Sequence, residues 1–323
     1  MKMVPQTTSW QYKLEPPPQS HNDECYSSIE EEVCFNSHRK RLNLRHQSIR
    51  QEHAKHISAG LSPTLSELSI GPVFEDSRTM LSILSSLPTS IISLDLDLRS
   101  QLDFVERVMP VLCSLTHIRS LTLRFFGDGG ALALAKCIRL NPNLQSLDLK
   151  WNRIGSKGAG AILGALVSCN HGLRHLNLSC NCILDCNPIK TFLPYFQLES
   201  LDISFNLIGD NECALIARGL SWNSSLRELD IRGCQRITDC GLRYLLSCIS
   251  DRNTSLWYLH VPKSCQGQSD VCVQILHWLR VNKTGRRLLQ EQEIIDRSLW
   301  ATILAKASSD PSCIYHFVRN GIL

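Results

Sequence analysis

Four aspartates recur at matching places in this sequence, and carboxylates can act as acids, bases or metal ligands. Catalysis by a carboxylate also needs a second residue class, held within hydrogen-bond reach as nucleophile or base. The sequence positions no such residue beside these aspartates, so they do not predict an enzyme. Each of the four follows a leucine of a repeated pattern: Asp95, Asp148, Asp202 and Asp230.

Three short motifs resemble metal or phosphate sites only in part. A structural zinc site needs two pairs of ligands. A zinc-binding helix needs a glutamate between histidines four residues apart, and a phosphate loop needs Lys followed by Ser or Thr. These completing residues are missing, so the sequence predicts no metal and no cofactor. The motifs are Cys180-x-Cys182-x-x-x-Cys186, His53-x-x-His56 and Gly127-Asp128-Gly129-Gly130.

The elements that would position these side chains are set by a repeat. A pattern of the form Leu-x-x-Leu-x-Leu, with Ile or Val accepted in place of Leu, recurs eight times. Successive copies begin 25 to 30 residues apart, the period of a repeat array. Leu42 and Leu44 lie 26 residues before the matching leucine and isoleucine of the first copy, so a degraded copy precedes it. The copies begin at Leu65, Ile91, Ile118, Leu144, Leu173, Leu198, Leu226 and Leu256.

A second pattern lies between these copies. Apolar or small residues recur at positions i, i+3 and i+7, the spacing of one helical face, as in Ala159, Ile162 and Leu166. Each unit is therefore predicted to be a short strand followed by a helix. Parallel strands stack about 4.8 Å apart, whereas packed helices need about 8–10 Å. The array must therefore curve, and the sequence predicts an α/β solenoid with a concave parallel sheet and convex helices.

Two stretches carry a family resemblance. The stretch from Leu144 to Ala159 reads Leu-x-x-Leu-Asp-Leu-x-x-Asn-x-Ile-Gly-x-x-Gly-Ala and looks like a leucine-rich repeat of the ribonuclease-inhibitor type. The stretch from Leu229 to Leu242 looks like the cysteine-containing type common in F-box substrate adaptors. The resemblance covers about residues 41–262 and implies a right-handed leucine-rich-repeat solenoid, or horseshoe. The family's turn residue, an Asn or Cys that bonds neighbouring turns, appears as Asn152, Asn181, Asn206 and Cys234, and is replaced elsewhere by Val73, Arg99, Phe126 and Ser264.

The two ends of the chain differ from the repeats. Residues 1–40 are polar, with the proline run Pro16–Pro18 and the acidic run Glu30–Glu32, and we expect a disordered tail. A docking motif around Trp10, Tyr12 and Tyr26 is the alternative. We assign residues 41–262 to the solenoid. Residues 263–323 are predicted to form a helical cap over the last repeat, with helices over 270–289, 298–307 and 311–319.

Composition limits the partners. The chain has 43% hydrophobic residues, 20% charged residues and a net charge of +4, which suits a folded protein without an extended basic stripe for nucleic acid. We find no apolar run long enough for a bilayer and no secretory leader. The 15 cysteines are therefore expected to be small core residues in a reducing, cytoplasmic location. The basic run His38–Arg41 leaves nuclear import open as an addition, with a solvated patch as its other reading.

The inner surface is the predicted binding site. Residues that flank the buried strand leucines face the concave side, because strand side chains alternate between the two faces. They form an acidic row beside a shorter basic row, with aromatic residues along one rim, and such residues anchor protein interfaces. The predicted partner-binding residues are Asp95, Arg124, Phe125, Asp148, Lys150, Trp151, Asp202, Phe205, Asp230 and Arg232.

The sequence thus favours a non-catalytic scaffold that binds a protein partner on its concave face. Two alternatives stay open. The cysteine-type unit suggests an F-box-like substrate receptor for ubiquitin ligation, although residues 1–40 show no hydrophobic helical pattern for an adaptor-binding module. The resemblance to ribonuclease-inhibitor repeats also admits a GTPase activator of the nuclear-transport type.

Overall fold

The computed structural model describes residues 40–45, 49–71, 77–97, 102–124, 127–169, 172–265, 269–284, 286 and 305. The tail predicted over residues 1–40 lies outside these ranges, apart from Lys40. The helices predicted over 298–307 and 311–319 also lie outside them, apart from residue 305.

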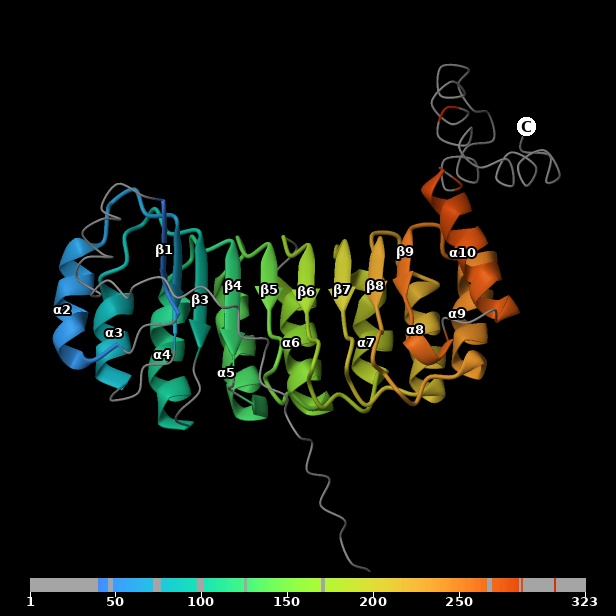
Figure 1. Cartoon of the computed structure of the whole chain (residues 1–323), viewed down its shortest axis with the longest axis horizontal. Helices are drawn as coiled ribbons and strands as arrows, with labels where there is room; N and C mark the ends of the chain where they lie inside the picture. Colours follow the sequence, from blue (N-terminus) through green and yellow to red (C-terminus); the bar gives the residue numbers. More distant parts are fainter. Residues whose placement is uncertain are drawn as a thin grey trace, which may run out of the picture.

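Nine parallel strands form one sheet in the described part of the chain, and they lie in the order of the sequence (Figure 1). The degraded first copy, with Leu42 and Leu44, forms the first strand and pairs in register with the second. The strands are β1 Arg41–Leu44, β2 Glu67–Ile70, β3 Ser93–Asp97, β4 Ser120–Arg124, β5 Ser146–Asp148, β6 His175–Asn177, β7 Ser200–Asp202, β8 Glu228–Asp230 and β9 Tyr258–His260.

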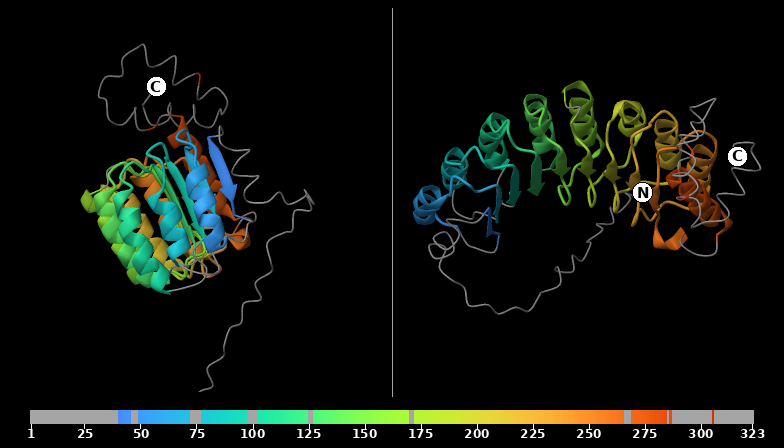
Figure 2. Two further views of the ribbon diagram at one scale, coloured as in Figure 1. Left: turned by 90° about the vertical axis from the view of Figure 1, so that its left-hand side faces the viewer. Right: turned by 90° about the horizontal axis from the view of Figure 1, so that it is seen from above.

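A helix follows each of these strands in the described ranges. The right-hand view of Figure 2 shows an arc with the helices on its outer side and the strands on its inner side, as the spacing argument predicts. The helices are α2 Gln51–Gly60, α3 Ser77–Ser85, α4 Leu102–Ser114, α5 Gly127–Leu140, α6 Ser156–Cys169, α7 Asn187–Phe192, α8 Asp210–Leu220, α9 Asp239–Asp251 and α10 Asp270–Lys283. Two short 3-10 turns lie at η1 Leu193–Tyr195 and η2 Lys263–Cys265.

The core is one continuous cluster that runs the length of the array. In the unit of β5 and α6, Leu147 of the strand, Leu149 directly after it and the helix residues Ala159, Ile162 and Leu166 are all buried, as both periodic patterns predict. Each unit covers its neighbours, and no unit has a closed core of its own. The stability of each unit therefore depends on its contacts with the units next to it.

Turn asparagines form hydrogen bonds between adjacent units beside the sheet. The side chain of Asn181 accepts hydrogen bonds from the backbone N–H groups of Asn152 at 3.1 Å and Ile154 at 2.9 Å. Its amide nitrogen donates to three carbonyls, those of Leu149, Leu178 and Ser179. One unit later Asn206 accepts from the backbone N–H of Ile183 and donates to the carbonyls of Leu178, Ile203 and Ser204. Cys234 has only a thiol at the same position and donates weakly to Ile203 at 3.7 Å.

A second set of bonds caps two helices, α6 and α9, from the helix one unit before each of them. Asp128 of α5 accepts hydrogen bonds from the backbone N–H groups of Gly155 and Gly158 at the start of α6, at 2.8 and 3.1 Å. Asp210 of α8 does the same for Thr238 and Gly241 at the start of α9. The first N–H groups of a helix lack partners within the helix, and a carboxylate there also meets the positive end of the helix dipole. The glycine-rich run around Asp128 is therefore a structural cap.

The cysteines depart in one respect from the expected set of unpaired core residues. Cys186, Cys213 and Cys234 are buried and free, as expected. Cys113 and Cys137, however, form a disulfide between α4 and α5, with their Cα atoms 4.6 Å apart. They are 24 residues apart, close to one repeat, so the stacking of units brings them together.

Thiol alkylation provides a test of this core. Burial raises the pKa of Cys213 to about 12 and that of Cys234 to about 11, which lowers the reactive thiolate fraction, whereas Cys182 and Cys240 are exposed. With iodoacetamide at neutral pH, we expect the exposed pair to react at least about 100-fold faster than the buried pair. Peptide mass spectrometry over a time course would measure the rates. Equal rates for Cys234 and Cys240 would contradict the packing described above.

Candidate functional site

The register of the sheet brings the predicted inner-face residues into one row. Asp148 of β5 stands opposite Asn177 of β6, which stands opposite Asp202 of β7, and Asp202 stands opposite Asp230 of β8. The same row begins with Asn43, Ser69, Asp95 and Thr122 and ends at His260. The acidic row predicted from the sequence is therefore a physical row on the inner face of the arc.

Most aspartates of this row form a hydrogen bond to their own backbone near the end of the strand. One side-chain oxygen of Asp148 accepts a hydrogen bond from the backbone N–H of Lys150, two residues later, at 2.9 Å. This is an Asx turn, which gives a backbone N–H close after the strand a partner. The bond recurs from Asn43, Asn177, Asp202 and Asp230. Either Asp or Asn can form it, so the turn does not require the charge.

At the N-terminal end of the row the charges pair with one another. Arg45 forms an ion pair with Asp95, and the Nε atom of Arg124 lies 3.9 Å from a carboxylate oxygen of the same aspartate. Burial and the neighbouring Arg124 lower the pKa of Arg45, while Asp97 and Asp148 act in the opposite direction. β3 and β4 continue two residues beyond Asp95 and Thr122, the residues in the row. Asp95 therefore forms no Asx turn, and its carboxylate interacts with the two arginines.

At the C-terminal end the charges also pair within the chain. Arg232 donates to Asp230 through Nε at 2.9 Å and through a terminal nitrogen at 2.5 Å, which raises the pKa of Arg232. Asp230 is only 5% exposed. On the next strand His260 lies 3.0 Å from Glu228. Of the predicted residues, Asp95, Arg124, Asp230 and Arg232 therefore already have charged partners.

The middle of the row, over β5 to β7, is different. Asp148 and Asp202 each use one carboxylate oxygen in the Asx turn, and the other oxygen has no hydrogen bond to a residue that the structure describes. The ammonium group of Lys150 likewise has no ion pair there. All three side chains are half-buried. This part of the inner face offers charges of both signs to a partner.

Two aromatic side chains border this middle part. Trp151 is 43% exposed and Phe205 is 59% exposed, and both have left-handed backbones, with φ of 64° and 53°. A large side chain in this conformation costs about 1–2 kcal/mol relative to glycine. The matching position one unit after Phe205 holds Gly233, at φ 69°. A Cβ atom on Gly233 would lie 2.4 Å from the ring of Phe205, so the ring rests directly against this glycine. Phe125, the third predicted aromatic, lies outside the described residues.

The structure adds residues that the sequence reasoning missed. Leu207 is exposed between the buried turn residue Asn206 and the buried Ile208, and Leu184 is exposed next to Ile183 on the preceding unit. Both lie in the segments between a strand and the next helix, as Trp151 and Phe205 do. The signal available in the sequence was an apolar residue beside, and not within, the buried positions of the repeat. We define the rim as Trp151, Leu184, Phe205 and Leu207.

The described residues hold no group of three or more His, Cys, Asp and Glu side chains placed to bind a metal ion. They also hold no helix that is both long and apolar enough to cross a membrane.

Comparison with known proteins agrees with this architecture. A family model described as "Leucine Rich repeat" matches residues 140–163, 169–185 and 223–246. The chain is 30% identical to the Tonsoku-like protein of Bos taurus over 166 residues, which covers 48% of this chain and 12% of that protein. It is 28% identical to the human NACHT, LRR and PYD domains-containing protein 12 over 233 residues, covering 68% of this chain and 21% of the relative. The chain thus spans much less than half the length of these relatives.

A solved structure shares the fold. In the crystal structure of the Rad7 and Elc1 complex in yeast, one chain matches with a TM-score of 0.53 and 17% sequence identity, over 76% of this chain and 63% of that one. The repeat pattern, the nine-stranded parallel sheet and the family model lead to one assignment. The chain is a leucine-rich-repeat protein.

Proposed function

We propose that this protein is a non-catalytic scaffold that binds a protein partner on its concave face, over β5 to β7. The contact would combine the rim, defined above, with the free charges of Asp148, Lys150 and Asp202. The predicted residues at each end of the row form ion pairs within their own end. They would therefore shape the surface and make fewer direct contacts with the partner.

The observation that carries this proposal is the pair of exposed aromatics in left-handed backbone. Gly233 occupies the matching position of another unit, so the fold accepts glycine there without strain. Trp151 and Phe205 are the costlier choice, and strained, exposed residues are typical of functional sites. Tryptophan is also among the residues that dominate binding energy at protein interfaces.

The test is partner capture from cell extract with variant baits. Trp151→Ala combined with Phe205→Ala, and separately Asp148→Lys combined with Asp202→Lys, should each reduce recovery of specific partners by at least about tenfold, the loss expected for an interface hot spot. Quantitative mass spectrometry of the captured proteins would measure it.

Two matched controls separate binding from folding. Asp148→Asn with Asp202→Asn keeps both Asx turns and removes only the charges, because Asn43 and Asn177 make the same bond. Tyr195→Ala with Leu140→Ala removes exposed apolar groups away from the rim. Partner recovery that is unchanged in the rim variant, or equally reduced in the Tyr195 control, would overturn the proposal.

The two alternatives have direct assays of their own. A substrate receptor for ubiquitin ligation would co-purify a ligase adaptor with the full chain. A GTPase activator would increase the rate of GTP hydrolysis by its GTPase in a turnover assay. The exposed rim and the free charges over β5 to β7 favour a partner-binding surface, so the scaffold is our choice.

A further inference from the structure

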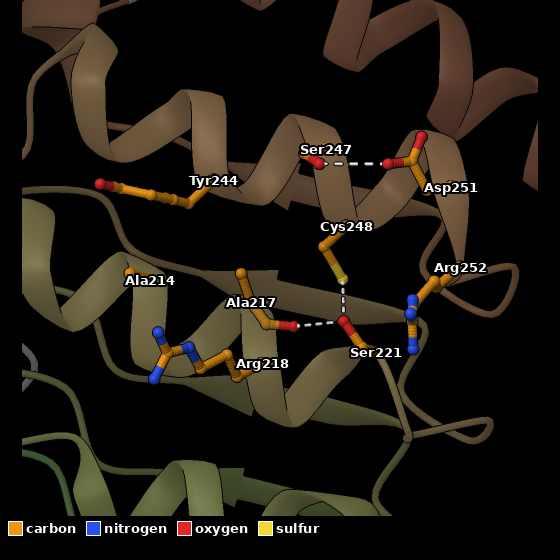
Figure 3. A pocket seen from close by; sticks show the side chains of 9 residues that line it. All are labelled: Ala214, Ala217, Arg218, Ser221, Tyr244, Ser247, Cys248, Asp251 and Arg252. Atoms are coloured by element: carbon orange, nitrogen blue, oxygen red, sulfur yellow. Dashed lines mark hydrogen bonds between the residues drawn. The ribbon is translucent and has the colours of Figure 1, made fainter.

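A groove lies on the opposite, convex side of the array, between α8 and α9. Its volume is about 210 Å³, below the roughly 300–1,000 Å³ of most small-molecule sites. Figure 3 shows the small side chains of Ala214 and Ala217 on α8 on one side and those of Ser247 and Cys248 on α9 on the other. A groove of this size fits one or two side chains of a protein segment.

The groove exists because this helix boundary is not filled in the way that its neighbours are. Between α6 and α7, Pro188 packs over Gly160 and Phe192 packs over Gly164. Between α7 and α8, Leu193 of η1 packs against Gly219. Between α8 and α9 the large residue is Tyr244, and it is 53% exposed at the groove wall. Ala214 of α8 therefore stays partly exposed in the groove.

The charges at the groove are unbalanced. Arg218 and Arg252 both line it and both are exposed, and neither forms an ion pair with a carboxylate that the structure describes. In Figure 3 they lie on opposite sides of Ser221. The groove has one carboxylate, Asp251, which accepts hydrogen bonds from Ser247 at 3.2 Å and from Ser250 at 2.7 Å. Burial lowers the pKa of the nearby Arg286, and the charge of Asp251 acts in the opposite direction.

An aromatic residue stands beside these arginines. Trp222 follows α8 and is 70% exposed, and the guanidinium of Arg252 lies 5.7 Å from the centre of its ring. Tyr, Trp and Arg are the residue types that most often carry binding energy. Arginine also binds carboxylates in a bidentate geometry. Here Tyr244 and the two arginines line one groove, and Trp222 lies beside it, against Arg252.

We propose that this convex groove is a second binding site, which takes a Glu or Asp side chain from an acidic segment of a partner protein. Arg218 and Arg252 hold the carboxylate from its two sides, and Tyr244 and Trp222 pack against the apolar parts of the segment. The site lies on the side of the array that faces away from the strands, so it can be occupied together with the concave face and does not depend on the function proposed above.

The test uses the full chain and a defined probe. A fluorescein-labelled peptide of sequence Ser-Glu-Glu-Leu-Glu-Glu-Ser, and its counterpart with Gln in place of each Glu, are titrated with the protein and followed by fluorescence anisotropy. We expect the acidic peptide to bind at least tenfold more tightly than the Gln peptide, and Arg218→Gln with Arg252→Gln to remove that preference. Filling the groove with Ala214→Leu should weaken binding of the acidic peptide without any change of charge.

The matched control removes two other arginines. Arg139 lies in the last turn of α5, as Arg218 does in α8, and Arg243 is exposed on α9 without lining the groove. Arg139→Gln with Arg243→Gln has the same net charge as the groove variant and should bind within twofold of the unmodified protein. Circular dichroism melts would confirm that every variant is folded.

Several results would overturn the inference. They are no preference for the acidic peptide, equal losses in the groove and control variants, or full binding in Ala214→Leu. Tighter binding of a single-stranded DNA oligomer than of the peptide, lost in the same groove variant, would assign the groove to nucleic acid instead. Self-association of the protein that disappears in the groove variant would assign it to a second copy of the chain.

Discussion

Asn181→Ala is expected to lower the free energy of unfolding by about 3–5 kcal/mol, because it leaves several buried polar groups without partners at once. The backbone N–H groups of Asn152 and Ile154 lose their acceptor, and carbonyls on two units lose their donor. No water-accessible route replaces these bonds, since Asn181 is only 7% exposed. Urea denaturation followed by circular dichroism would measure the change.

Two further variants sharpen this prediction. Asn181→Cys should lie between the unmodified protein and Asn181→Ala, because Cys234 fills the same turn position with one weak bond. Asn187→Ala is the control: Asn187 is exposed and its side chain bonds only to Asp185, so the loss should stay below about 1 kcal/mol. If Asn181→Ala costs no more than this control, the turn asparagines do not hold the units together.

Gly241→Ala is expected to destabilise the protein by about 2–4 kcal/mol, although alanine is the better helix former by about 1 kcal/mol. A Cβ atom at this position would lie 2.4 Å from a carboxylate oxygen of Asp210 and 3.0 Å from its Cα. Asp210 must then move, and its hydrogen bonds to Thr238 and Gly241 are lost. Thermal and urea unfolding of the variant would give the sign and the size.

A double-mutant cycle isolates the cause. In an Asp210→Ala background, the same Gly241→Ala change should cost much less, because the oxygen that it displaces is already gone. Gly129→Ala is the matched control, since a Cβ atom there would meet nothing within 4 Å. It should be neutral or stabilising by up to about 1 kcal/mol. Additive effects of Asp210→Ala and Gly241→Ala would refute the capping contact between α8 and α9.

The strands, helices and turn asparagines could be predicted from the sequence because each depends on spacing along the chain. A buried leucine at a fixed place in each unit determines the register of the whole sheet. The same spacing places Asn152, Asn181 and Asn206 one above another. These features repeat, so each unit supports the interpretation of the next.

The pairing of the inner-face charges could not be predicted in this way. Asp95 and Asp148 both occur in the sequence Leu-Asp-Leu, yet the first joins an ion cluster and the second forms an Asx turn. The difference arises because β3 continues two residues further than β5, and because Arg45, which directly follows β1, reaches Asp95 on β3. Such contacts span two strands and depend on exact strand lengths.

The left-handed backbone at Trp151 and Phe205 could be predicted in part. Trp151, Cys180, Phe205 and Gly233 occupy one aligned position, and the glycine was a visible sign that a left-handed residue is needed there. What the sequence could not provide is the direction of the Phe205 ring, which rests on Gly233 of the next unit. A side chain's orientation depends on the neighbour that it meets.

The Asx turns also bear on how such a protein can change over evolutionary time. Because Asp and Asn make the same bond at the end of a strand, one central residue of the inner face can gain or lose a charge while the architecture stays intact. Asn43 and Asn177 lie in the same row as the aspartates, so a single molecule shows both versions of the turn. The binding specificity can therefore change one unit at a time, through Asp–Asn exchanges that leave the stability of the fold unchanged. Related arrays can in this way acquire different partners on the same scaffold.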